Sequence, residues 1–146
     1  MLRFLAQALL IIVVFVAAWR AGGKPERYVA SIYLAMLVAS AVNAFSGSAH
    51  AGADYTGVKI LHFILDTLAL FGVVTIALRY DRWWTLWVGS VQFIAVMAHV
   101  LRMLDWPMPP IAYAVMERWP VWLAVILTGV GTWLQIRRSH GTPTST

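Results

Sequence analysis

Long apolar runs separated by short polar segments make up most of this chain. Two of them, residues 60–78 and 83–104, are joined by the four-residue turn Arg79-Tyr80-Asp81-Arg82. The hydrocarbon core of a bilayer takes about 20 residues of helix. Because a chain in lipid must satisfy its own backbone polar groups, this pattern predicts an antiparallel pair of membrane-spanning helices.

Two further apolar runs precede this pair. Residues 4–19 form the first, and residues 28–45 form the second. The segment between them contains two glycines, which end one helix, and Pro25, which opens the next. A small, polar, glycine-rich stretch over residues 46–57 then predicts a loop.

The last apolar segment is too long for a single crossing. Residues 109–136 would make a helix of about 42 Å, whereas the hydrocarbon core is about 30 Å thick. Proline removes a backbone donor and disfavours helix in the residue before it, so Trp119-Pro120 predicts a break. We expect a short interfacial helix over residues 110–118 and a fifth span over residues 120–136.

Composition supports a membrane protein. The chain is 61% hydrophobic and 12% charged, whereas soluble domains are about 45–50% apolar and about 25% charged. We therefore predict an all-α fold, a polytopic transmembrane helical bundle of five spans with a short interfacial helix before the last. Residues 1–138 form one bundle and residues 139–146 a polar tail. The absence of cysteine excludes disulfides and thiolate metal sites.

The charges favour one orientation in the membrane. The net charge is +5, but the basic residues lie singly at the ends of apolar runs and form no face for nucleic acid. On one side lie Arg20, Lys24, Arg27, Arg79, Arg82, Arg137 and Arg138, and on the other lie Arg3, Lys59, Arg102 and Arg118. The positive-inside rule then predicts a multi-pass protein of a bacterial-type inner membrane, N-terminus out and C-terminus in. Cleavage of residues 4–19 as a signal peptide would export part of the larger basic group, and it stays an alternative.

Most tryptophans fall at the ends of the expected spans, where aromatic residues anchor membrane proteins at the interface. Trp83, Trp84 and Trp87 follow the turn between the paired spans. We expect these three side chains to form an aromatic belt.

Polar residues inside a span are costly and are candidates for function. They are Gln7, Asn43, His62, Asp66, Gln92, His99 and Arg102. His62 and His99 each lie 17 residues from the central turn, which places both roughly 25 Å from it. Spacings of four and seven residues put His62 with Asp66, and Gln92 with His99, on one face of each helix. We predict a pocket that opens toward the outer face.

Glu117 and Arg118 are expected at the rim of this pocket. Several interpretations of its interior stay open. One is a structural ion pair of Asp66 with His99 or Arg102, since polar groups often do no more than join helices. His62 and His99 could ligate a b-type haem, or with Asp66 a metal ion.

A relay of ions or protons would need groups that reach both faces, and the inner halves of the expected spans are almost wholly apolar. The chain also lacks G-x-S-x-G, P-loop, H-E-x-x-H and G-x-G-x-x-G motifs. We therefore predict a binding, sensing or accessory subunit, more a non-enzyme than an enzyme. A b-type haem redox protein and a small ion or proton transporter unit are the alternatives. Expected partners are the lipid bilayer and a second membrane protein or copy of this chain.

Overall fold

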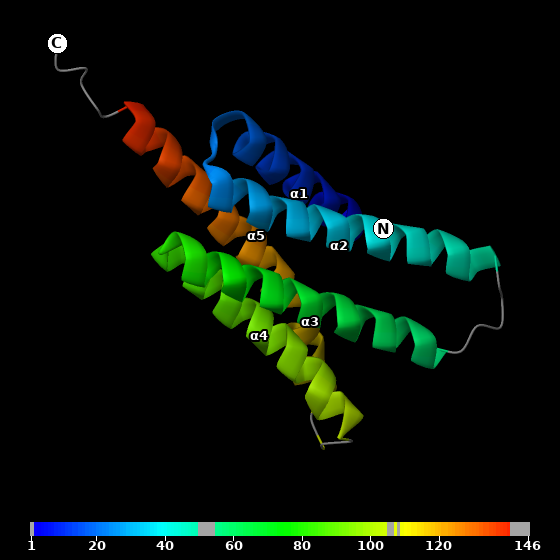
Figure 1. Cartoon of the computed structure of the whole chain (residues 1–146). Coiled ribbons are helices and arrows are strands. Elements are labelled where there is room, and N and C mark those ends of the chain that lie inside the picture. Colours follow the sequence, from blue (N-terminus) through cyan, green and yellow to red (C-terminus); the bar gives the residue numbers. More distant parts are fainter. Residues whose placement is uncertain (1, 50–54, 105–106, 108, 141–146) are drawn as a thin grey trace, which may run out of the picture.

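The computed structural model describes residues 2–49, 55–104, 107 and 109–140 (Figure 1). Its helices are α1 (Leu2–Ala21), α2 (Lys24–Ala49), α3 (Tyr55–Tyr80), α4 (Trp83–Met103) and α5 (Pro110–His140). Each contains a segment of 18 to 22 residues that is long and apolar enough to cross a membrane. The described part of the chain has no strand. The prediction of an all-α protein with five membrane-spanning helices is confirmed.

The helices form a ring. Each one packs against the next along the chain, and α5 packs against α1, while α2 also contacts α5. Successive helices run in opposite directions, as Figure 1 shows, so the α3–α4 turn lies at the same end of the bundle as the α1–α2 turn. This arrangement gives all five helices access to a common interior.

The turn between α1 and α2 consists of Gly22 and Gly23. The Gly22 amide donates a hydrogen bond to the Ala18 carbonyl at 2.9 Å. A Cβ on Gly22 would lie 2.6 Å from the same oxygen, so only glycine fits this close approach. Pro25 lies in the first turn of α2, as predicted, where its missing N–H leaves no helical bond unmade.

Helix α5 is continuous through Pro120, whereas the sequence predicted a break there. Proline removes one backbone bond, and membrane helices tolerate it because neighbouring helices stabilise them. Pro120 is buried against the rest of the bundle. The expected interfacial helix over residues 110–118 is thus the first part of α5, and the apolar segment that can cross the membrane is Trp119–Ser139.

Two other boundaries differ from the sequence prediction. The ends of α2 and α3 extend into the expected loop over residues 46–57, of which residues 50–54 lie outside the described part. Helix α5 extends to His140 and so includes the first two residues of the predicted polar tail. The rest of the tail, residues 141–146, lies outside the described part.

Each of the five helices contributes to the apolar core. Its buried members are Ile11, Val14, Val29, Tyr33, Val73, Ile76, Trp84, Val88, Ala124 and Val125. Large apolar side chains also cover the outer faces of the helices, as expected where lipid is the solvent. Trp84 belongs to the core and is only 3% exposed, so its assignment to an aromatic belt was wrong. Trp83 and Trp87 are exposed, as a belt requires.

Candidate functional site

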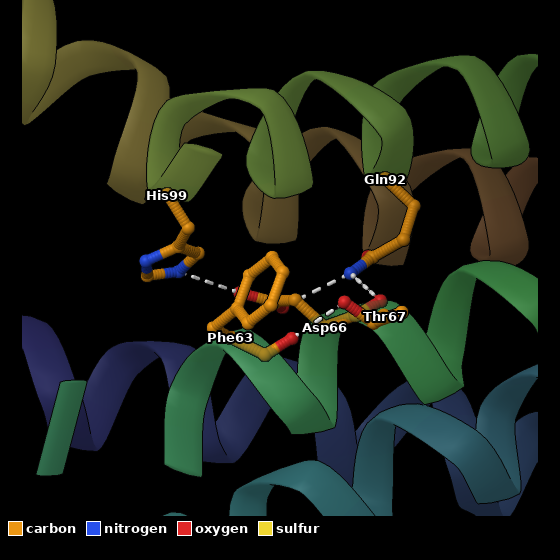
Figure 2. A network of polar contacts seen from close by, with 5 residues as sticks. All are labelled: Phe63, Asp66, Thr67, Gln92 and His99. Atoms are coloured by element: carbon orange, nitrogen blue, oxygen red, sulfur yellow. Dashed lines mark hydrogen bonds and ion pairs between the residues drawn. The ribbon is translucent and has the colours of Figure 1, made fainter. Parts of the chain in front are cut away.

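The polar side chains predicted on the two central spans meet where α3 and α4 pack together. Asp66 of α3 is 9% exposed, and Gln92 of α4 is completely buried. The His99 Nε2 atom lies 3.0 Å from Asp66 Oδ2. Gln92 Nε2 donates to Asp66 Oδ1 at 2.9 Å and to the Asp66 backbone carbonyl at 3.2 Å (Figure 2).

A third helix joins this arrangement through Tyr33 of α2. Its hydroxyl donates to Gln92 Oε1 at 3.0 Å. Tyr33, Asp66, Gln92 and His99 form a polar network that links α2, α3 and α4, and we keep this name for these four residues. The network satisfies both ends of the Gln92 amide.

These contacts indicate where the protons lie. Gln92 presents its amino group to the Asp66 side chain, because the tyrosine hydroxyl donates to its carbonyl. Asp66 thus accepts a hydrogen bond at Oδ1. As a carboxylate it accepts another at Oδ2, so Nε2 of His99 carries a proton and donates it. Charge-assisted bonds of this kind offset part of the cost of burying a carboxylate.

The aromatic ring of Phe63 in α3 packs against the imidazole of His99. The Phe63 ring meets the His99 ring edge-on, with ring centres 6.2 Å apart. Thr67 donates its hydroxyl proton to the Phe63 carbonyl at 2.7 Å, within the same helix (Figure 2). The ring of His99 is therefore held by packing as well as by Asp66.

A cavity of about 270 Å³ borders the network. It is called the pocket below, and all five helices line it. Its lining residues are Phe4, Gln7, Ile11, Tyr33, Met36, Leu37, Ser40, His62, Asp66, His99 and Val121. The lining combines three members of the network with three further polar side chains, Gln7, Ser40 and His62, and its other members are apolar. The described residues that line the pocket include no lysine or arginine.

The pocket lies in the half of the bundle away from the α3–α4 turn. Phe4 begins the apolar segment of α1, and Val121 lies near the start of the apolar segment of α5. Trp84, which follows the α3–α4 turn, is packed in the core at the opposite end. The pocket therefore lies in the half that the charge pattern predicts to face outward.

The structure brings some of the candidate residues together and leaves others apart. His62, Asp66 and His99 line the pocket, and Gln92 lies behind it in the network. Asn43 is half-buried on α2, and Arg102 is exposed near the end of α4; neither lines the pocket. Asp66 pairs with His99. The side chains of Glu117 and Arg118, predicted at the rim, lie outside the described part.

Two buried residues of α2 were missed by the sequence interpretation. One is Tyr33, which lies among apolar residues in the sequence and donates to Gln92 in the structure. A buried tyrosine hydroxyl usually needs a hydrogen-bond partner, and this requirement was the signal that the sequence offered. The other is Glu26, which was expected in a loop but is 1% exposed in the first turn of α2. Among the described residues, Glu26 Oε2 has no hydrogen-bond partner. The half of the bundle that contains the α1–α2 turn therefore does contain a buried ionisable group.

The residues at the site bear on whether it could hold a metal ion or a haem. The described residues include no group of three His, Cys, Asp or Glu side chains that could hold a metal ion. His62 and His99 line one pocket, but His99 Nε2 is engaged by Asp66, so a haem iron would have to use Nδ1 or break that bond. A haem band in the visible spectrum that disappears in both His62→Ala and His99→Ala would support the haem alternative.

Comparison of the chain with models of known protein families, with curated proteins and with solved structures finds no match.

Proposed function

We propose that this membrane protein binds a small amphipathic molecule in the pocket, which is reached from the outer face of a bacterial-type inner membrane. The observation that carries the proposal is a carboxylate–imidazole pair that borders a cavity lined by all five helices. Ligand sites are typically concave and mostly apolar, with a few polar groups that fix orientation. The pocket has this composition.

A purely structural ion pair would need no cavity. Polar groups that only join helices are satisfied by one another, and close packing around them excludes space. Gln92 fits that description, because it is completely buried and hydrogen-bonded at both ends of its amide. Asp66 and His99 do not, because both line about 270 Å³ of space. This contrast favours binding over a structural role.

The proposed orientation places the N-terminus outside and the C-terminus inside. The α3–α4 turn and the other connections at that end carry most of the basic residues, which the positive-inside rule assigns to the cytoplasm. The pocket then opens on the other side. In this position the protein would act as a binding or sensing component, or as an accessory subunit of a membrane complex.

The proposal is tested with four probes that share a naphthalene skeleton: 2-naphthol, 2-methoxynaphthalene, 2-naphthylmethylammonium and 2-naphthoate. Their binding to the protein in lipid nanodiscs is measured by calorimetry, with empty nanodiscs as the blank. We expect saturable binding of at least one probe, lost when Ser40→Phe fills the pocket. If every signal matches the empty nanodiscs, or Ser40→Phe binds as the wild type does, the proposal is wrong.

Glu26 supports a second candidate, a small proton transporter unit. Its carboxyl group is buried at the end of the bundle opposite Asp66, so buried ionisable groups lie in both halves of the bundle. In liposomes with an imposed pH gradient, proton flux should fall in both Asp66→Asn and Glu26→Gln. Flux that is absent in the wild type, or unchanged in either variant, would remove this candidate.

A further inference from the structure

The proton on His99 Nε2 determines what the other nitrogen of this imidazole can do. A neutral imidazole has one N–H donor and one acceptor nitrogen. In the neutral ring of His99, donation from Nε2 to Asp66 Oδ2 leaves Nδ1 as the acceptor. Figure 2 shows this second ring nitrogen directed away from Asp66.

His99 Nδ1 has no protein partner among the described residues, since the only hydrogen bond of this side chain is the one to Asp66. It is also absent from the buried atoms that lack a partner, so it is not sealed inside the protein. His99 lines the pocket. Nδ1 is therefore an acceptor that a molecule in the pocket can reach.

We infer that the ligand of the pocket is an uncharged, lipid-soluble molecule with a phenol-type hydroxyl that donates its proton to His99 Nδ1. This inference rests on the proposed function. A phenolic hydroxyl is a stronger donor than an aliphatic one, and a carboxylate partner makes the imidazole a better acceptor. Simple phenols and hydroquinones belong to this class.

The walls of the pocket disfavour the other classes. Anions are disfavoured, because the described lining residues include the Asp66 carboxyl group and no lysine or arginine to neutralise a negative charge. Asp66 is the negative group, but each of its oxygens already accepts a hydrogen bond within the network. A wholly apolar ligand would leave Nδ1 unpaired away from water, which is unfavourable. Phe4, Ile11 and Met36 provide the apolar surface that suits a ring.

The network also provides a substitution that reverses the chemistry of Nδ1. In Asp66→Asn, the amide oxygen can still accept from Gln92, and the amino group then faces His99 Nε2. That amino group is a donor, so Nε2 becomes the acceptor and the proton moves to Nδ1. The variant should prefer a ligand that accepts a hydrogen bond.

The test compares 2-naphthol, which donates, with 2-acetylnaphthalene, which only accepts, on protein in nanodiscs. The wild type should bind 2-naphthol roughly tenfold more tightly, as expected for one well-made hydrogen bond. Asp66→Asn should lose or reverse this preference, and Ser90→Ala, an exposed position of α4, should keep it.

A measurement on the wild type keeps the inference testable if Asp66→Asn does not fold. In ¹⁵N NMR spectra, Nδ1 of His99 should be unprotonated and Nε2 protonated, and 2-naphthol should shift the Nδ1 signal. A protonated Nδ1, or equal binding of the donor and acceptor probes, overturns the phenol-type ligand. Saturable binding of another probe that Ser40→Phe abolishes would then leave the proposed function standing, whereas no binding of any probe removes both.

Discussion

Gln92 is the residue that holds the polar network together. This residue of α4 accepts a hydrogen bond from Tyr33 of α2 and donates hydrogen bonds to two oxygens of Asp66 of α3. No water reaches it, since it is completely buried. Its removal would leave a buried hydroxyl and a buried carboxylate oxygen without their partners.

We predict that Gln92→Leu lowers the free energy of unfolding by about 1–3 kcal/mol, the usual cost of stranding buried polar groups. Ser90→Ala on the same helix is the control, because Ser90 is exposed and its hydroxyl donates to the Leu86 carbonyl within α4. The stability of both variants is measured by unfolding in mixed micelles with an increasing fraction of dodecyl sulfate. Equal midpoints for Gln92→Leu and Ser90→Ala would contradict the role given to the network.

Helical spacing was enough to predict the faces of the site but not all of its members. A helix places residues four or seven positions apart on one side, so His62 with Asp66 and Gln92 with His99 could be expected to face a common space. Tyr33 lies on another helix, 59 residues from Gln92 in the chain. Nothing in local spacing relates two such positions, because their contact depends on how α2 packs.

At the scale of the helices, α4 and α5 approach closely where Gly131 faces Trp84. A Cβ added at Gly131 would lie 2.6 Å from a ring carbon of Trp84, which is itself buried. A buried indole cannot move aside as the end of a flexible side chain can. Gly131 therefore allows the large ring to pack between these two helices.

We predict that Gly131→Ala destabilises the protein by about 1–3 kcal/mol through overpacking. Gly129→Ala, two residues earlier on α5, is the matched control, because its Cβ would lie at an ordinary van der Waals distance of 3.5 Å from Val14. Since alanine has a higher helix propensity than glycine, the Gly129→Ala control should leave the stability unchanged or raise it slightly. Thermal unfolding in detergent compares the two, and similar losses from both would refute the packing argument.

The positions of the spans could be predicted from the sequence because hydropathy reports the length of apolar chain that lipid requires. The orientation of each side chain could not. Trp83 and Trp84 are neighbours with the same hydropathy, yet a helix turns them about 100° apart, and one faces outward while the other enters the core. Pro120 is similar, because its effect on α5 depends on the helices that pack around it.

At the scale of the whole molecule, the two ends of the ring differ in charge. At the α3–α4 turn, Arg82 donates to Gln135 of α5 at 3.3 Å. Near the end of α5, the Arg137 guanidinium lies 3.9 Å from the centre of the Trp133 ring, a cation–π contact. Arg82 thus links the α3–α4 turn to α5, and Arg137 packs on a ring of its own helix, both at the end that we assign to the cytoplasm.

We predict that alkaline phosphatase is inactive when fused at the C-terminus and active when fused after Ala49, because this enzyme folds only outside the cytoplasm. Green fluorescent protein at the same two positions should give the opposite pattern. Phosphatase activity at the C-terminus would contradict the orientation, and with it the outward position of the pocket.

The ring itself could not be derived from the sequence. Contacts of α1 with α2 and of α3 with α4 follow from short connections, but the packing of α5 on α1 joins opposite ends of the chain. Those long-range contacts bring Phe4 and Val121 to the same pocket. Complementary surfaces determine such contacts, and an apolar run in a sequence does not reveal its shape.

We propose that the pocket inside the ring opens to the outer face, and the cysteine-free chain allows this opening to be tested directly. A single cysteine is introduced at Ser40, which lines the pocket, or at Thr132, which is buried away from it. Right-side-out vesicles are treated with a small, membrane-impermeant, cationic methanethiosulfonate. We predict that Ser40→Cys is modified from the outside and Thr132→Cys is not; modification of Ser40→Cys only from the inside, or not at all, would contradict the account.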